Sequence, residues 1–476
     1  MVGLARTLSA GGCSVLIRDQ AGRTARLLLY SGILWLFVAL AAGVGATLVA
    51  SGALYIELPY GPAGADLLQP VFFHALVFGW LAMAGTGVGL LAVQRAHGLT
   101  LISEFWGQVA VWLWNGANAV AVGLLAMGWR EGPTFMDALW PVKAVWLAAL
   151  LLLLLNVART LSRTEQPLYA SAWYLLAALT WMAPIYLLGS GILAPGWPVD
   201  DIGATLYGLY TQGVVWLWAV PLGLGAALYV APDLAGQPLY SRALASLGLW
   251  GLALYAGTGA ERLAGTDMPA WLSALSTSLA VLTLVPALAS TANIVQTIRP
   301  RWDAVTSTPP GRALVWGTGL LLLASVQAAL QPLSVVQEAV RLTQLSVAAP
   351  LTALLGGSTF LLFAGIYHLL PMLRRPADRP DKPLYTLRAA RWHLGASGLG
   401  IVLFVIGLWL GGTMQLTERL TFGFGADLAG VLWPALILQG VALAILLFGQ
   451  IFLVYTVAKA ASAPQPVKLP VIITNP

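Results

Sequence analysis

The sequence predicts an all-α, polytopic membrane protein with twelve transmembrane helices in one bundle. Charged residues make up only 9% of the 476-residue chain, whereas a typical soluble domain has about 25%. Apolar residues make up 59%, and they gather in runs of about 20 residues, the length that crosses a hydrocarbon core about 30 Å thick. The connections between these runs are short. We therefore expect one membrane domain and no separate soluble domain.

The apolar segments follow one another along the whole chain, and glycine or proline inside them is compatible with a membrane helix. They cover residues 27–53, 69–94, 105–128, 135–160, 168–192, 205–230, 240–260, 269–297, 312–331, 344–373, 391–415 and 428–458, approximately. We expect a cytoplasmic N-terminal tail over 1–26, the twelve-helix domain over 27–460 and a cytoplasmic C-terminal tail over 461–476. The first segment has full spanning length, so we interpret it as a retained helix and not as a signal peptide.

Basic residues predict the orientation of the bundle. If the N-terminus is cytoplasmic, most of the 24 Lys and Arg residues fall on the cytoplasmic side, as the positive-inside rule requires. We therefore expect a multi-pass protein of a bacterial or archaeal-type plasma membrane, with both termini in the cytoplasm. The net charge of +6 then reflects topology and not nucleic-acid binding. A single cysteine, Cys13, excludes a cysteine-based metal or iron–sulfur site.

Local signatures occur in a fixed order along these segments. They read QPVFFHALVFGW and AVQR within 69–95, EQPLYASAWYLLA at 165–177, PDLAGQPLYS at 232–241, LSVAAPLTALLGGSTFLLFAGIYHLLPML at 345–373 and RWHLGASGLGIVLFVIGLWLGGTMQ at 391–415. Together they resemble the haem-copper oxidase subunit I superfamily, nearest to the cbb3-type cytochrome c oxidase subunit I, with nitric oxide reductase large subunits as near relatives. The resemblance implies an oxidase subunit I-like bundle that works in a respiratory chain.

The resemblance also implies where the metal ligands of this family would stand, and none of these positions holds a histidine. The positions matched to haem ligands are Phe72, Ala349 and Leu351, and those matched to copper ligands are Gln212, Glu261 and Arg262. We refer to these six as the aligned positions. Haem iron in this family and its copper require imidazole ligands, and Phe, Ala and Leu offer no ligand atom. We therefore expect no haem, no copper and no catalytic residue.

Residues close to the aligned positions can also be compared with those of the family. Tyr255 matches the redox-active tyrosine of the family, but its usual cross-link partner is an aligned copper position, so we interpret it as a packed or hydrogen-bonded tyrosine. Leu330-Gln331-Pro332 stands where the family has Glu-Gly-Pro, so the acid of that motif is replaced by Leu330. Pro350 removes a backbone hydrogen bond between two aligned positions. Because a void costs about 20–25 cal/mol per Å³, we expect side chains such as Phe72, or lipid, to fill the cofactor space.

The histidines that remain offer one alternative. A haem b held by His74 and a methionine, Met83 or Met414, is conceivable. The favoured interpretation is that His74 packs between helices with its ring N–H on a backbone carbonyl. His368 and His393 match family positions that are not metal ligands, and we expect both to be structural.

Ionisable side chains inside membrane segments are functional candidates by default. Lys143 is the clearest one; the alternative is that its long stem snorkels towards the outer interface, helped by Asp137. Glu104 begins the third segment and is expected to cap it. Glu261 and Arg262 are adjacent, and we expect an ion pair or hydrogen bonds that seal the cofactor space.

Three functions remain open at this stage. The first is a pseudoenzyme that keeps the subunit I scaffold as a structural, assembly or regulatory partner of other respiratory membrane subunits. The second is a cytochrome c oxidase-like electron-transfer subunit with unusual haem ligation. The third is a transporter or channel that reuses the cofactor space, with Lys143, Gln212, Glu261 or Arg262 along its path.

Overall fold

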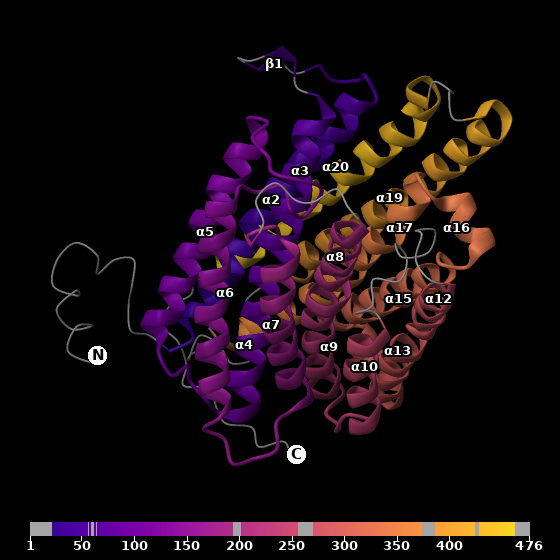
Figure 1. Cartoon of the computed structure of the whole chain (residues 1–476). Helices are drawn as coiled ribbons and strands as arrows, with labels where there is room; N and C mark the ends of the chain where they lie inside the picture. Colours follow the sequence, from indigo (N-terminus) through magenta and orange to yellow (C-terminus); the bar gives the residue numbers. More distant parts are fainter. Residues whose placement is uncertain are drawn as a thin grey trace.

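The chain folds into a bundle of long helices that lie side by side (Figure 1). This computed structural model describes residues 21–55, 57–58, 61–62, 64–193, 201–255, 270–373, 386–423 and 428–461. The first half of the bundle contains α2 (Arg23–Ala50), α3 (Ala65–His74), α4 (Ala82–His97), α5 (Glu104–Ala126), α6 (Trp140–Leu161), α7 (Ala170–Gly189), α8 (Asp201–Gln212) and α9 (Val220–Ala235). The second half contains α10 (Arg242–Tyr255), α12 (Ala270–Leu282), α13 (Leu284–Ile298), α15 (Pro309–Leu330), α17 (Gln344–Leu351), α18 (Thr359–Leu373), α19 (Leu387–Phe422) and α20 (Leu428–Ala461).

Short elements connect some of these helices. They are the helices α14 (Trp302–Thr306) and α16 (Ser334–Val340), a 3-10 turn (Arg299–Arg301), and an antiparallel ribbon of β1 (Glu57–Leu58) with β2 (Gly61–Pro62). We name the two ends of the bundle the Arg23 end and the Ala50 end, after the first and last residues of α2. The β-ribbon and α16 lie at the Ala50 end (Figure 1).

The all-helical membrane class predicted from the sequence is confirmed. Eleven helices in the described chain are long and apolar enough to cross a membrane, and they correspond to eleven of the twelve predicted segments. The seventh predicted segment, 240–260, corresponds to α10, of which 14 residues are described. Residues 256–260 of that segment lie outside the described residues, as do Glu261 and Arg262.

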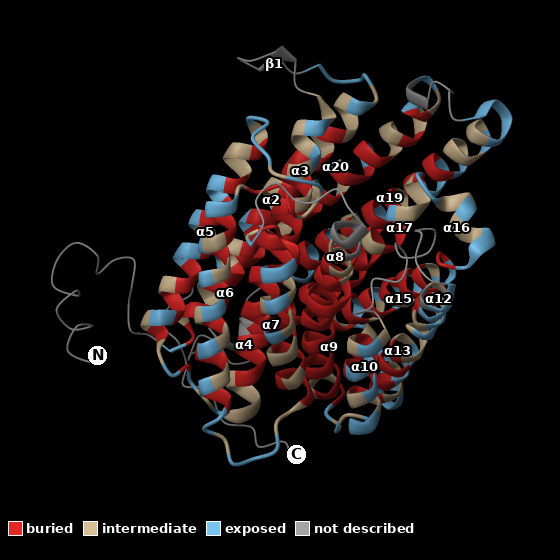
Figure 2. Cartoon of the chain, in the orientation of Figure 1, coloured by how far each residue is buried: buried red, intermediate tan, exposed pale blue. Residues whose placement is uncertain are grey.

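Three helices form the centre of the bundle. The spans differ in the share of residues that are buried within their most apolar stretch. That share is 100% in Ala65–His97 and in Leu206–Ala235, and 89% in Gln344–Leu369. In the other eight spans it is 39–56%. Figure 2 shows the contrast: α9 is buried along its length, while α5 exposes one side. A helix that is apolar on all sides belongs in a core. The three central helices also carry the four described aligned positions.

Each central helix contains a widened, π-helical turn. These turns are η3 (Ala75–Leu81) between α3 and α4, η4 (Gly213–Ala219) between α8 and α9, and η7 (Thr352–Ser358) between α17 and α18. π-helical turns are rare and concentrate at functional sites. Here η3 begins three residues after Phe72, and η4 and η7 begin directly after Gln212 and Leu351.

Side chains of neighbouring helices bind the carbonyl groups of these turns. The Phe78 carbonyl in η3 accepts hydrogen bonds from Trp114 Nε1 at 2.8 Å and from Asn118 Nδ2 at 3.0 Å. Thr359 Oγ1 donates to the Leu354 carbonyl in η7 at 2.9 Å and accepts from Trp80 Nε1 at 3.0 Å. The hydrogen bonds therefore stabilise two of the turns and join η3 to the end of η7.

Glycine lets the central helices approach one another closely, as is common between membrane helices. A Cβ added at any of three glycines would lie 3.0 Å or less from the facing residue. The pairs are Gly85 with Leu222, Gly223 with Ser358 and Gly365 with Val88.

Helix α2 begins at Arg23, four residues before the predicted apolar segment. The Glu104 carboxylate explains the extension, because it accepts hydrogen bonds from the backbone N–H groups of Gly22 at 2.7 Å and Thr24 at 2.9 Å. It thereby satisfies donors at the first turn of α2. Glu104 therefore does not cap its own helix, as the sequence suggested; the Ser103 hydroxyl does so, by accepting from Trp106 N.

Candidate functional site

The described aligned positions all lie towards the Ala50 end of the three central helices. Phe72 is on α3, Gln212 is the last residue of α8, and Ala349 and Leu351 are on α17. Tyr255 is half-buried and is the last described residue of α10. Pro350 lies inside α17, and the α-helical ladder ends one residue later, where η7 begins. The described aligned positions therefore lie in α-helical turns that lead directly, or within three residues, into a π-helical turn.

Phe72 is packed into the protein core. It is 5% exposed, and a Cβ added at Gly43 of α2 would lie 2.8 Å from the Phe72 ring and 3.1 Å from Leu443 of α20. The Phe73 ring lies 5.1 Å from it, centroid to centroid. The Phe72 ring therefore occupies the space between α2, α3 and α20, and it offers no ligand atom there.

Gln212 and Leu351 face a common cavity. The cavity has a volume of about 530 Å³ and is lined by residues of α3, the loop before α6, α8 with η4, α15, α16, and α17 with η7. Its polar lining includes Gln69, Gln331 and Arg341. Ala349, by contrast, is fully buried. The cavity thus joins two aligned positions, one matched to a copper ligand and one to a haem ligand, with no imidazole among the residues that line it.

Glutamine side chains hold α17 against its neighbours. Gln327 Nε2 from the last turn of α15 and Gln331 Nε2 from the residue that follows this helix donate to the Leu345 carbonyl at 3.1 and 2.7 Å. The Gln344 backbone N–H donates to Gln415 Oε1 of α19 at 2.7 Å. These bonds give Gln331, which follows the position of the family's acid (Leu330) and lines the cavity, a structural role.

His74 is buried two residues after Phe72. Its ring lies 5.0 Å from the Phe78 ring, and the Asn118 side chain approaches it. Neither ring nitrogen has a hydrogen-bond partner among the described residues. The predicted bond from the ring to a backbone carbonyl is therefore wrong. The Phe78 carbonyl, in the turn that follows His74, instead accepts hydrogen bonds from Trp114 and Asn118.

The other histidines form hydrogen bonds at the Arg23 end. His368 Nε2 lies 2.5 Å from Asp233 Oδ2. His393 lies 2.9 Å from the Tyr367 hydroxyl through Nδ1 and 3.1 Å from Gln450 Oε1 through Nε2. Such contacts are typical of structural histidines. In the described part of the chain, no group of three or more His, Cys, Asp and Glu residues is arranged to hold a metal ion.

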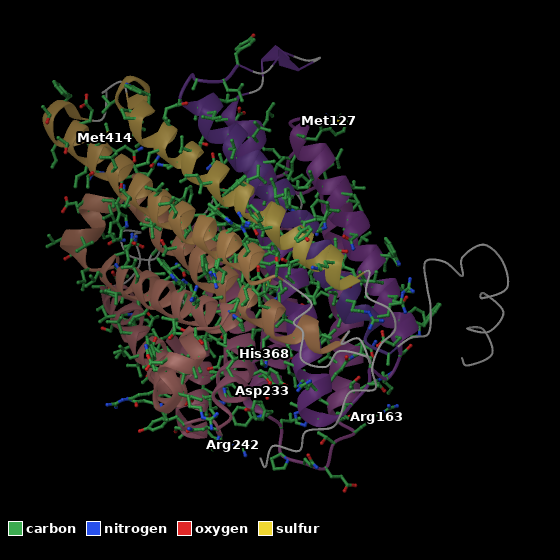
Figure 3. All side chains as sticks on the ribbon, turned by 180° about the vertical axis from the view of Figure 1, so that it is seen from behind. Met127, Arg163, Asp233, Arg242, His368 and Met414 are labelled. Carbon is green, nitrogen blue, oxygen red and sulfur yellow. The ribbon has the colours of Figure 1, made fainter. Side chains whose placement is uncertain are left out.

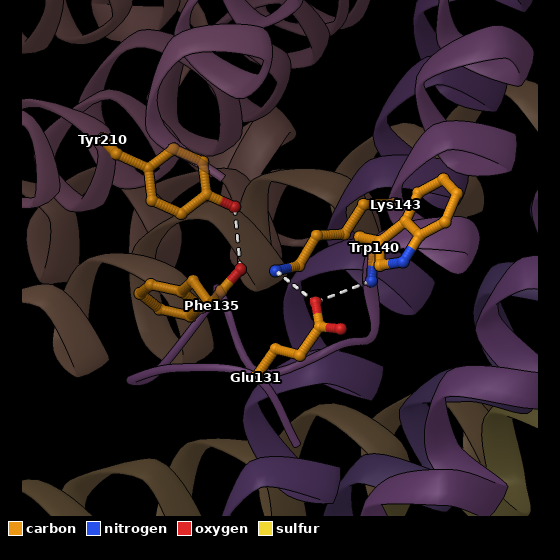
Figure 4. A network of polar contacts seen from close by, with 5 residues as sticks. All are labelled: Glu131, Phe135, Trp140, Lys143 and Tyr210. Atoms are coloured by element: carbon orange, nitrogen blue, oxygen red, sulfur yellow. Dashed lines mark hydrogen bonds and ion pairs between the residues drawn. The ribbon is translucent and has the colours of Figure 1, made fainter. Parts of the chain in front are cut away.

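Lys143 forms an ion pair with Glu131 of the loop that precedes α6 (Figure 4). Its Nζ lies 3.7 Å from Glu131 Oε2, which also accepts the Trp140 backbone N–H at 2.8 Å. Lys143 is only 2% exposed, and its stem carries the ammonium to Glu131 in the loop beyond the start of the span, the direction that the snorkelling alternative predicts. Its ion-pair partner is Glu131 and not Asp137. The sequence did not single out Glu131, because only the folded loop brings it back over α6.

Asp137 lies in the same loop, outside the spans, and is 2% exposed. Burial raises the pKa of its carboxyl to about 7, and the charges of Lys143 and Arg130 oppose this effect only in part. Two residues of the same loop, Thr134 and Phe135, line the cavity, and the Phe135 carbonyl accepts the Tyr210 hydroxyl at 2.8 Å. The ionisable cluster of Glu131, Asp137 and Lys143 therefore supports one wall of the cavity.

Sequence comparison places the chain among known proteins. The family described as "Cytochrome C and Quinol oxidase polypeptide I" matches residues 23–441. The chain belongs to this family. The resemblance inferred from the five signatures is thereby confirmed at the level of the family.

Curated relatives are distant. The chain is 26% identical over 276 residues to the "Cytochrome c oxidase subunit 1 homolog, bacteroid" of Bradyrhizobium diazoefficiens, covering 55% of this chain and 49% of the relative. It is 24% identical over 332 residues to the "Cytochrome c oxidase subunit 1" of Rhodobacter capsulatus, covering 65% and 61%. It is 22% identical over 252 residues to the "Cbb3-type cytochrome c oxidase subunit CcoN1" of Stutzerimonas stutzeri, covering 51% and 52%. The chain thus spans about half to three-fifths of the length of these relatives.

A solved structure shares the fold over more of the chain. It is described as "Cryo-EM structure of a heme-copper terminal oxidase dimer provides insights into its catalytic mechanism", and it superimposes with a TM-score of 0.72 at 14% identity, covering 94% of this chain and 86% of that one. The oxidase subunit I fold therefore extends over nearly the whole bundle.

Proposed function

We propose that this member of the oxidase subunit I family is a cofactor-free scaffold, a structural, assembly or regulatory component of a respiratory membrane complex. One observation carries the proposal: the Phe72 ring fills the space between Gly43 and Leu443 at the position where the family resemblance requires a haem ligand. Ala349 and Leu351 also lack ligand atoms, and an amide such as that of Gln212 is a poor copper ligand. The residues present do not fit the haem and copper of the family.

The proposal is tested on the protein purified in mild detergent from cells that load haem into a cbb3-type relative expressed in parallel. We expect no Soret band, no α and β bands after reduction with dithionite, and less than 0.1 mol of copper per mol of chain, roughly the background of such assays. A haem band at unit stoichiometry would overturn the proposal. If that band disappears in His74→Phe, the alternative haem b site at His74 is established instead.

The role as a component of a complex is tested separately. We expect the tagged chain to co-purify with other respiratory membrane subunits in stoichiometric amounts, and we expect deletion of the chain to lower the amount of assembled complex. Recovery of the chain alone, together with unchanged assembly, would contradict this role.

A second candidate function rests on the cavity. Gln69, Gln212 and Arg341 give the 530 Å³ cavity a polar lining at the Ala50 end of the bundle, which favours a transporter or channel that reuses the cofactor space. Proton or solute flux into liposomes that contain the chain, reduced by Gln212→Leu, would support this candidate over the scaffold. Equal flux with and without the chain would exclude it.

A further inference from the structure

A second pocket opens at the Arg23 end of the bundle, at the opposite ends of the central helices from the cavity described above. It has a volume of about 460 Å³, and its polar lining includes Arg95, Tyr169, Asp233, Gln237 and Arg242. The rest of its lining is largely proline, leucine and alanine. The pocket thus combines charged groups with an apolar wall.

Four helix ends meet around this pocket. Helix α4 ends at His97 and α9 at Ala235, while α7 begins at Ala170 and α10 at Arg242. Because these helices cross the membrane, their ends mark the boundary between the hydrocarbon core and the polar region. The pocket therefore lies at the level of lipid headgroups.

Two guanidinium groups line this pocket. Arg242 stacks on Trp173, with its Cζ 5.5 Å from the ring centroid, and donates from Nη2 to the Leu168 carbonyl at 3.3 Å. Arg95 interacts with the Tyr229 side chain and with the Asp233 carboxylate. Both groups keep further donors, since a guanidinium carries five N–H groups.

The pocket keeps a net positive charge in spite of its one acid. The Asp233 carboxylate is held by His368 Nε2 at 2.5 Å, and Figure 3 shows both residues towards the same end of the bundle as Arg242. A third guanidinium, that of Arg301, lies 3.7 Å from the point where a Cβ at Gly236 would stand. Ala170 also lines the pocket, and the first turn of a helix carries a partial positive charge.

We propose that this pocket binds the phosphate headgroup of an anionic phospholipid, with the acyl chains along the apolar wall. Arg95 and Arg242 are the two recognition residues, because guanidinium groups bind phosphate oxygens through paired hydrogen bonds. Basic pockets between membrane helices on the cytoplasmic side suit such headgroups, and the charge distribution predicts that the Arg23 end is cytoplasmic. The proposal does not depend on whether the chain binds haem.

The test measures lipid binding to the full chain by native mass spectrometry. Phosphatidylglycerol and phosphatidylcholine are titrated separately onto delipidated protein. We expect phosphatidylglycerol to bind at least tenfold more tightly, and we expect Arg95→Gln and Arg242→Gln each to weaken its binding about tenfold, the equivalent of one charged hydrogen bond. Arg163→Gln is the matched control, since Arg163 is exposed at the same end and outside the pocket.

Two further measurements separate the outcomes. Arg242→Lys keeps the charge but loses the paired hydrogen bonds and the stacking on Trp173, so a folded variant with an affinity between those of the unchanged chain and Arg242→Gln is expected. This result distinguishes lost recognition from lost folding. Inorganic phosphate at equal concentration should not displace phosphatidylglycerol; if it does, the ligand is the free anion and not a lipid. Unchanged binding in the Arg95→Gln, Arg242→Gln double variant would overturn the proposal.

Discussion

Phe72 and the pair Gln212 and Leu351 occupy aligned positions of the same family, yet their surroundings differ. Phe72 is packed between α2, α3 and α20, so that an added methyl group at Gly43 would clash with its ring. Gln212 and Leu351 instead face a cavity of about 530 Å³. Under the proposed scaffold function, the bundle would accommodate the absence of a large cofactor in two ways, by a side chain packed into the space at one position and by a polar cavity at the other.

Of the two regions, the packed position at Phe72 should contribute more to the free energy of unfolding. Phe72→Ala should lower the free energy of unfolding by about 3–5 kcal/mol, because it removes a buried ring that its neighbours cannot replace. The loss is measured by chemical denaturation in detergent. Phe73→Ala is the matched control: Phe73 is half-buried beside the cavity, so its loss should be smaller. Equal losses would remove the distinction between the two regions.

The cavity wall should respond to pH. The raised pKa of Asp137 means that the folded chain binds this proton more tightly than the unfolded chain. Its contribution to stability is therefore complete below about pH 4 and is lost as the pH rises through about 7. The expected decrease is at most about 4 kcal/mol, and Asp137→Asn should abolish it. Asp66→Asn is the control, since that side chain is 65% exposed; an unchanged slope in Asp137→Asn would contradict the assignment.

The contact between α2 and Phe72 can also be tested by a substitution at Gly43 of α2. Gly43→Ala should cost about 1–3 kcal/mol, the usual penalty for overpacking, because the new Cβ meets the Phe72 ring at 2.8 Å. In a Phe72→Ala background the same change should cost little, so the two effects should not be additive. Gly116→Ala serves as the control, since nothing lies within 4 Å of a Cβ there.

The smallest effect is expected where the cavity offers space. Leu351→Phe should change the free energy of unfolding by less than about 1 kcal/mol, since the larger ring enters a void and does not displace packed neighbours. Ala349→Phe, two residues away at a fully buried position, should destabilise the chain clearly. A large loss for Leu351→Phe would show that the cavity closes in solution.

Much of this architecture could be predicted from the sequence, because the membrane requires long apolar helices. Hydropathy located the spans, and the spacing within signatures placed Phe72, Gln212, Ala349 and Leu351 on the central helices. The partners of polar groups could not be predicted. Glu104 accepts hydrogen bonds from the start of α2, which lies about 80 residues away in the sequence. Glu131 forms an ion pair with Lys143 because the loop before α6 folds back onto this helix.

Whether an aligned position is packed or open could not be predicted either. Phe72 and Leu351 are both large apolar side chains, and only Gly43 and Leu443, from two other helices, make the first of them a packed residue. The π-helical turns have no simple sequence signature, since the Phe78 carbonyl depends on Trp114 and Asn118 from another helix.

The π-helical turns also constrain how this bundle can change. Each such turn holds one residue more than an α-helical turn, so removing it by deletion would rotate the rest of the helix by about 100° and shorten it by about 1.5 Å. In α9 and α18 that rotation would displace Gly223 and Gly365 from their contacts. Side chains at the aligned positions can be exchanged one at a time, whereas the extra residue beside each of them cannot be deleted without repacking the bundle. We therefore expect the widened turns to persist through sequence change longer than the side chains at the aligned positions.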